Sequence, residues 1–296
     1  LFPGLSVAQW GMLHSLLALV LVMTGRYAIL ETAMKLFIGL MFLVVMVCAL
    51  LVLPDTGDIL TGMLVPNIPA DGILYIFGII GGVGGSVTIV CYGYWIRERG
   101  WTQPTDMGQS RVDLAAAYLL TGLFGIAVMI IAAGVHPEVI TGKEMALSVA
   151  RRLESIVGPV GLWCFLIGFW SAVFSSMLGV WQGVPYLFAD FVHEWRNTGD
   201  EKVIDTGSLP YRAYLAYLAV PPMILLWAGK PVWVVLIYSV AGAAFMPLLA
   251  GLLLYMNGLR NWLGPLRNRW LANLALLAAL ALFAALFIRE LIEMLE

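Results

Sequence analysis

One apolar stretch with a glycine-rich centre constrains the possible folds more than any other part of the sequence. Residues 78–101 are long and apolar enough to cross a bilayer, and glycine fills four of the five positions from 81 to 85. Each glycine costs a helix about 1 kcal/mol relative to alanine, and unpartnered backbone groups are costlier in lipid than in water. A helix broken at about residues 81–86 must lie inside protein or beside a water-filled cavity, as in transporters that bind substrate at the membrane midplane. The alternative is an unbroken helix whose glycines let a second helix pack closely.

The composition predicts a polytopic membrane protein built of helices. Of the 296 residues, 61% are hydrophobic and 11% are charged, whereas soluble domains carry roughly 25% charged residues. At about 20 apolar residues per crossing, we expect an all-α helix bundle, a single transmembrane domain over residues 1–296. Its eight candidate spans cover roughly residues 6–24, 30–53, 73–97, 113–134, 157–181, 211–228, 231–256 and 270–290.

Several features refine this picture of an integral membrane protein. The chain begins with Leu and its first span is short, so we expect it to lack N-terminal spans of a longer protein. The fifth span is expected to continue as helix to about Trp195, and its Gly179-x-x-x-Gly183 run predicts a close-packing face. Residues 142–156 mix charged and apolar positions, which favours an amphipathic helix on the membrane surface. The expected partner is the lipid bilayer of a bacterial-type plasma membrane, and the net charge of −2 gives no indication of nucleic-acid binding.

Basic residues orient the spans. Eleven of the 16 Lys and Arg lie on the side that collects the connections after spans one, three, five and seven. Connections rich in Lys and Arg stay in the cytoplasm, so this side is predicted to be cytoplasmic. The loop at residues 54–71 contains three Asp and no Lys or Arg, and it is predicted to face outward.

The broken span offers the most specific candidate for a binding site. Freed carbonyl oxygens of Gly84 and Gly85, with the hydroxyls of Ser86 and Thr88, would be hard oxygen ligands for a metal ion. Polar groups inside spans are costly and often functional. The alternative is that both hydroxyls bond back to their own helix.

Two ionisable residues are candidates for a proton path. His14 lies inside the first span, and Asp190 lies near the predicted cytoplasmic end of the fifth. Histidine changes charge near neutral pH and can relay protons. The alternatives are a histidine with one structural hydrogen bond and an aspartate at a solvated helix end. Tyr92 and Tyr94 are interpreted as interfacial aromatic residues.

The sequence argues against enzymatic activity. It contains no HExxH, GxSxG, Walker A or paired-cysteine metal motif. The three cysteines, Cys48, Cys91 and Cys164, each lie in an apolar stretch and are interpreted as small packing residues. We therefore expect neither a catalytic site nor a resident cofactor.

Five segments occur in an order shared with a known family. They are Gly25-Arg26-Tyr27 with Glu31 and Lys35, Leu64-Val65-Pro66-Asn67-Ile68-Pro69, Ser110-Arg111-Val112-Asp113-Leu114, Ser175-Ser176 with Gly179 and Gly183, and Met246-Pro247 followed by Leu248-Leu249. Together they resemble the Nramp (natural resistance-associated macrophage protein) family of proton-coupled divalent metal transporters. The resemblance begins at what would be the family's fourth helix and covers nearly the whole chain. It implies a partial leucine-transporter-like fold and alternating access.

The sequence departs from the family where the metal ligands would lie. The family's sixth helix carries a Met-Pro-His run, and the aligned positions here are Gly85, Ser86 and Val87. The family's tenth-helix Gln has no counterpart, and the Asp-Pro-Gly-Asn of its first helix is not in this sequence. In the family, the Met of this run is a soft ligand for manganese and iron. Preference for softer metals follows thioether ligands, so the loss of this Met shifts the expected selectivity toward magnesium or another hard ion.

The resulting hypothesis is a secondary transporter of divalent metal ions, coupled to protons and working by alternating access. Oxygen atoms of Gly84, Gly85 and Ser86 would contact the metal ion. Two alternatives stay open, a carrier of small organic substrates with the same fold and a membrane module that transports nothing.

Overall fold

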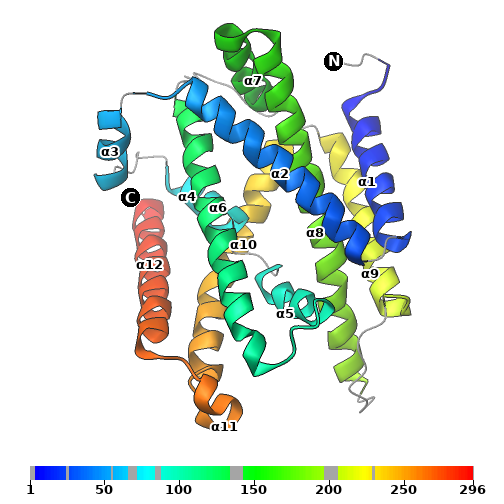
Figure 1. The fold of residues 1–296 in the computed structure, drawn as a ribbon, viewed down its shortest axis with the longest axis vertical. Coiled ribbons are helices and arrows are strands. Elements are labelled where there is room, and N and C mark those ends of the chain that lie inside the picture. The colour runs from blue at the N-terminus through cyan, green and yellow to red at the C-terminus, as the bar shows by residue number, and fades with distance from the viewer. Residues whose placement is uncertain are drawn as a thin grey trace. The chain divides into compact units, whose positions relative to one another are not determined.

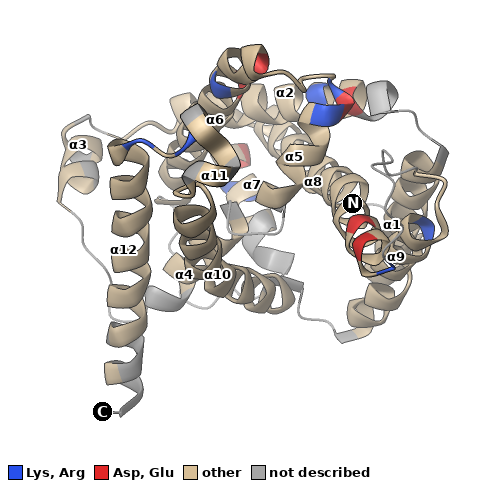
Figure 2. Ribbon diagram, turned by 90° about the horizontal axis from the view of Figure 1, so that it is seen from below, with Lys and Arg blue, Asp and Glu red and all other residues tan. Residues whose placement is uncertain are grey.

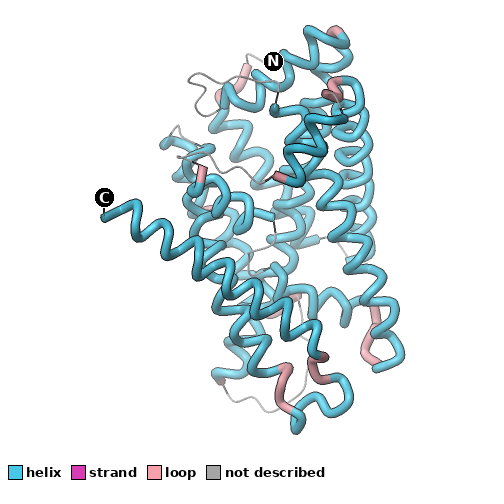
Figure 3. The backbone as a smooth tube through the Cα atoms, turned by 90° about the vertical axis from the view of Figure 1, so that its left-hand side faces the viewer, coloured by secondary structure: helices cyan, strands magenta, loops and turns pink. Residues whose placement is uncertain are grey.

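The protein is described by a computed structural model that covers residues 4–24, 27–54, 56–65, 72–83, 88–133, 143–196, 206–228 and 231–295. Helices make up all the regular secondary structure of these residues, and Figure 3 draws no strand among them. This confirms the all-α prediction. The chain forms two compact units, one of Leu1–Met63 and Val90–Trp233 and one of Leu64–Ile89 and Val234–Glu296. The single transmembrane domain stays a prediction.

The first unit contains most of the helices (Figure 1). Its elements are α1 (Val7–Thr24), α2 (Tyr27–Leu51), α3 (Thr56–Leu64, whose last residue is counted in the second unit), α5 (Thr88–Glu98, from Val90 on), η1 (Pro104–Asp106), α6 (Met107–Ala133), α7 (Lys143–Val157), α8 (Pro159–Trp195), α9 (Leu209–Ala219) and η2 (Pro221–Ala228). The second unit holds α4 (Ile73–Val83), α10 (Pro231–Met256, from Val234 on), α11 (Arg260–Leu263), η3 (Gly264–Leu266) and α12 (Trp270–Leu295).

Six helices among the described residues are long and apolar enough to cross a membrane. They are Glu31–Leu51, Pro104–Ala133, Pro159–Trp195, Leu209–Trp227, Trp233–Met256 and Trp270–Ile288, and each overlaps a predicted span. The first predicted span corresponds to a shorter apolar helix, Val7–Met23. The third corresponds to α4 and α5, two helices of 11 residues each. Neither half alone has the length of a crossing, which needs about 20 residues.

Helix α8 is the central element of the first unit. It has 37 residues and ends at Trp195, as predicted. Helices α1, α2, α7 and α9 all pack on it, and Figure 1 shows α2 crossing it along several turns. Two apolar clusters form there. One joins α1, α8 and α9 around Leu178 and Leu215, and the other joins α2, α6 and α7 around Ile131 and Leu153.

Helix α7 is the amphipathic helix that the sequence predicts. Its Ala150 and Leu153 are completely buried, whereas Arg151 between them is exposed. It packs on α8, so its apolar side completes the core of the first unit. The charged side is left for water or lipid headgroups.

In the second unit, α4 approaches α10 closely at one point. A Cβ atom added at Gly81 would lie 1.7 Å from the backbone oxygen of Ser239 and 2.6 Å from the backbone nitrogen of Ala243. Only glycine allows two helix backbones this near to each other. Helix α4 continues through Val83, so the interruption begins after residue 83 and not at about residue 81, as predicted. The first two glycines of the cluster serve helix packing, which was the alternative interpretation.

Charged residues are placed as a membrane protein requires. Figure 2 shows that Lys, Arg, Asp and Glu gather near helix ends, while the central turns of the long helices lack them among the described residues. Large apolar side chains instead face outward along these helices, as Leu271, Leu274, Leu277, Leu282 and Phe287 do on α12. Such a surface is stable against lipid tails and unstable in water.

Candidate transport site and its polar anchor

The predicted ion site lies mostly outside the described residues. Gly84, Gly85 and Ser86 are not among them, and Thr88 is described only as the first residue of α5, without its side chain. The described chain shows one helix ending at Val83 and another beginning at Thr88. The last carbonyls of α4 have no partners within that helix. They carry the partial negative charge that attracts a cation.

Helix α5 follows the predicted site along the chain, and a set of polar side-chain contacts, here called the polar anchor, holds it to its neighbours. The first of these contacts are with α8. The hydroxyl of Tyr94 donates a hydrogen bond of 2.6 Å to Oδ2 of Asp190. The hydroxyl of Tyr186 donates one of 2.5 Å to Oε1 of Glu98. The rings of Tyr94 and Tyr186 stack with centroids 5.8 Å apart and planes 10° from parallel. Each helix thus supplies one donor and one acceptor to its neighbour.

Gln182 is a second, buried contact between the same helices. Its side chain is 3% exposed, and its Oε1 accepts a hydrogen bond of 2.5 Å from the indole nitrogen of Trp95. The hydroxyl of Tyr211 on α9 donates to the backbone oxygen of Gln182 at 3.1 Å. A buried amide without partners would cost free energy, so the bond from Trp95 fixes the position of α5 along α8, while the bond from Tyr211 ties α9 to the same turn.

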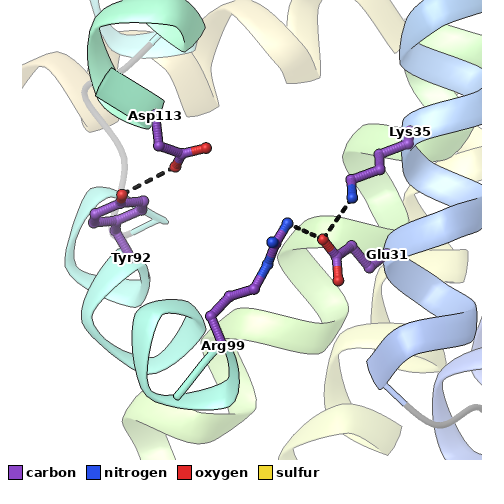
Figure 4. Close-up of polar contacts among 5 residues, drawn as sticks. All are labelled: Glu31, Lys35, Tyr92, Arg99 and Asp113. Atoms are coloured by element: carbon purple, nitrogen blue, oxygen red, sulfur yellow. Dashed lines mark hydrogen bonds and ion pairs between the residues drawn. The ribbon is translucent and has the colours of Figure 1, made fainter. Parts of the chain in front are cut away.

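Helix α5 also reaches α2 and α6 (Figure 4). The guanidinium of Arg99 forms an ion pair with Glu31 of α2, which also binds Lys35 at 2.8 Å. The hydroxyl of Tyr92 donates to Oδ2 of Asp113 on α6 at 3.0 Å. Helix α5 and Arg99, the residue that follows it, are therefore connected to three neighbouring helices through polar side chains.

The predicted Gly179-x-x-x-Gly183 face is confirmed as a packing surface. A Cβ atom added at Gly183 would lie 2.9 Å from the Trp95 ring and 3.1 Å from Cβ of Cys91. At Gly179 the nearest atom would be Sδ of Met34 on α2, at 3.7 Å. Cys91 is completely buried at this crossing, as a small packing residue should be.

His14 lies among aromatic residues between α1 and α8. Its Nε2 accepts a hydrogen bond of 2.9 Å from the indole nitrogen of Trp170, so its proton is on Nδ1. That nitrogen lies 2.7 Å from the backbone oxygen of Trp10 and donates to it. Both ring nitrogens are therefore engaged, Nδ1 within α1 and Nε2 in the bond that joins α1 to α8. This geometry favours the structural interpretation, and the role in a proton path stays a prediction.

Asp190 occupies a different setting from His14. It is half-buried at the last turns of α8 and accepts the Tyr94 hydroxyl, within the polar anchor. It is therefore partly accessible to water while it remains linked to α5. Among the described residues, no three His, Cys, Asp or Glu side chains come together as a metal site.

Sequence reasoning missed most of the polar anchor. Tyr94 was interpreted as an interfacial aromatic residue, and Glu98 and Tyr186 were not singled out. A usable signal exists, because a tyrosine and a carboxylate occur four residues apart on both helices, at 94 and 98 and at 186 and 190. Residues four apart share one helix face. The pairing between the two helices has no signature in the sequence.

The described residues form six apolar helices long enough to cross a membrane and two shorter helices, α4 and α5, which follow each other in the chain. This combination places the protein in the class of polytopic helical membrane proteins with a discontinuous span. The sequence model of the family described as Natural resistance-associated macrophage protein-like matches residues 1–293. The chain belongs to the Nramp family, which confirms the resemblance found in the sequence. Its members have the leucine-transporter-like fold and are transporters rather than enzymes, and membership implies transport of divalent metal ions. A comparison with curated proteins gives no match.

Proposed function

We propose that the protein is a proton-coupled secondary transporter of divalent metal ions that binds its substrate at residues 84–88 and works by alternating access. The observation that carries the proposal is the family match over residues 1–293. The chain places its glycine-rich segment between two helices of half length, as discontinuous transporter helices require. The plasma membrane is the proposed location.

The proposed ligands are hard oxygen atoms. The backbone oxygens of Gly84 and Gly85 and the hydroxyls of Ser86 and Thr88 offer no sulfur or imidazole. Oxygen ligands suit magnesium and manganese, whereas thioether and imidazole ligands favour softer ions. We therefore propose that magnesium competes with manganese at this site.

Coupling to protons is proposed to involve Asp190. A carboxylate that is half-buried and hydrogen-bonded to a neighbouring helix links its protonation state to the position of that helix. The asparagine variant Asp190→Asn keeps an oxygen that accepts from Tyr94 but cannot carry a proton. It should bind metal and lose the stimulation of uptake by an inward proton gradient.

The test is uptake into proteoliposomes that contain the purified protein. We expect Mn²⁺ uptake that Mg²⁺ inhibits, and a loss of about tenfold or more in Ser86→Ala and Thr88→Val, since each variant removes one ligand from a small site. Ser155→Ala is the matched control, because Ser155 is exposed on α7 and bonds only to the backbone oxygen of Arg152 within its own helix. Uptake of amino acids or amines that metals do not inhibit would favour the organic-substrate alternative. Absence of any uptake, with folded protein in the vesicles, would contradict transport.

A further inference from the structure

The contacts between α5 and α8 are reciprocal. Tyr94 and Glu98 lie four residues apart on α5, and Tyr186 and Asp190 lie four residues apart on α8. The tyrosine of each helix donates to the carboxylate of the other, at 2.6 Å and 2.5 Å. Both bonds lie on one face of each helix. The two tyrosine rings stack on each other between these bonds. We name the four side chains together the tyrosine–carboxylate clasp.

Besides the clasp, α5 is held to α8 by one buried hydrogen bond, which Trp95 donates to Gln182. The extensive helix pairs of the first unit are formed by α8 with α2, α7 and α9, and α5 is not among them. It approaches α8 closely at the crossing where Cys91 and Trp95 meet Gly183. A short helix fastened by directional hydrogen bonds can separate without exposing a large apolar surface.

Both carboxylates can tolerate an open clasp. Glu98 is exposed and Asp190 is half-buried, and both lie on the side predicted to be cytoplasmic. Water can therefore replace the tyrosine hydroxyls as hydrogen-bond donors when the helices part. The penalty for leaving a charged group unpaired applies to groups away from water, so it is small here.

We propose that Tyr94, Asp190, Tyr186 and Glu98 form a clasp that holds α5 against α8, and that its opening exposes the Cys91–Gly183 crossing to water. The four residues are positioning residues and do not touch the substrate. The place of this opening in the transport cycle rests on the proposed function. There it would release the half-helix that follows the proposed metal site.

Cys91 provides a native reporter of the clasp. It is completely buried against Gly183, so a water-soluble maleimide can reach it only when α5 separates from α8. The other two cysteines are removed by Cys48→Ala and Cys164→Ala. The rate of Cys91 alkylation then measures clasp opening in the reconstituted protein, with or without transport.

Removal of either tyrosine hydroxyl should speed alkylation. Tyr94→Phe and Tyr186→Phe keep the stacked rings, and each variant loses one hydrogen bond to a carboxylate. Loss of that bond corresponds to about a tenfold faster alkylation of Cys91. The double variant should react faster than either single variant. Glu98→Gln and Asp190→Asn keep an acceptor oxygen and should stay within about threefold of the parent, whereas Glu98→Leu should match Tyr186→Phe.

Tyr217→Phe on α9 is the matched control, because its ring is 59% exposed and lies outside the clasp. Alkylation of the tyrosine variants within about twofold of the parent would overturn the clasp, whatever happens to metal uptake. If one tyrosine variant does not fold, Glu98→Leu tests the same interface from an exposed position. Faster alkylation in vesicles that take up no divalent metal would support the clasp and overturn the proposed function.

Discussion

Helix α8 meets α2 and α5 in two chemically different ways. Against α2 it presents Gly168, and a Cβ atom there would lie 2.9 Å from Cγ1 of Val44. Around this point Val44, Val45 and Cys48 of α2 are all buried. Against α5 it presents Gln182, Tyr186 and Asp190, each of which makes a hydrogen bond across the interface. The α2–α8 interface depends on close packing, whereas the α5–α8 interface adds paired polar groups to the close approach at Gly183.

We interpret the contact between α2 and α8 as fixed and the contact between α5 and α8 as one that can open. Dispersion contacts between closely packed helices lose roughly a quarter to a half of their attraction when the gap widens by about 0.5–1 Å. Hydrogen bonds at a half-exposed helix end can be exchanged for bonds to water at small net cost. We therefore expect α2 and α8 to move together and α5 to move relative to them.

Substitutions at closely packed glycines should cause the largest losses in the free energy of unfolding, and the contact between α4 and α10 is the extreme case. Gly81→Ala places a methyl group 1.7 Å from the Ser239 backbone oxygen, so the two helices must separate. We expect a loss of about 3 kcal/mol or more in the free energy of unfolding. Unfolding in SDS, followed by circular dichroism, measures it.

Gly251→Ala is the control in the same unit, since nothing lies within 4 Å of a Cβ atom added at Gly251. It should be neutral or slightly stabilising, because alanine favours helix. Equal stability of Gly81→Ala and Gly251→Ala would contradict the close approach of α4 to α10.

The shape-dependent α2–α8 contact predicts an intermediate effect with a specific rescue. Gly168→Ala should reduce the free energy of unfolding by about 1–3 kcal/mol, because Val44 is β-branched and cannot turn its methyl group away freely. The second substitution Val44→Ala removes the atom in conflict and should restore part of the loss. A double-mutant cycle measures this coupling. Additive losses would mean that Gly168 and Val44 do not face each other.

Loss of one polar contact of α5 should have the smallest effect on the free energy of unfolding. Arg99 is 39% exposed and Glu31 20%, so Arg99→Gln should change the free energy of unfolding by about 1 kcal/mol or less. The rate of metal uptake should nevertheless change severalfold, since the pair fastens α5 to α2. Arg111→Gln, at an exposed position on α6, is the control for loss of one positive charge. If Arg99→Gln lost much stability and kept normal metal uptake, the polar contacts of α5 would be fixed structural contacts, which would contradict the interpretation of the two interfaces.

Local sequence patterns predicted several elements correctly. Continuous apolar runs identified the long helices, and the fifth was expected to reach Trp195, where α8 ends. The alternation of charged and apolar residues at 142–156 identified α7, and small residues four apart identified the packing face at Gly179 and Gly183. These features depend on neighbours within one or two helical turns, so the sequence alone is sufficient.

Tertiary structure alone decided which residues meet. Tyr94 and Asp190 are 96 residues apart, and His14 and Trp170 are 156 apart. The sequence also left the glycine cluster open between a broken helix and a packing surface. Gly81 belongs to the packing surface because Ser239, far along the chain, brings its backbone against it. Helix periodicity states which face a residue occupies, but the partner on that face depends on how distant helices cross, and no local pattern encodes the crossing.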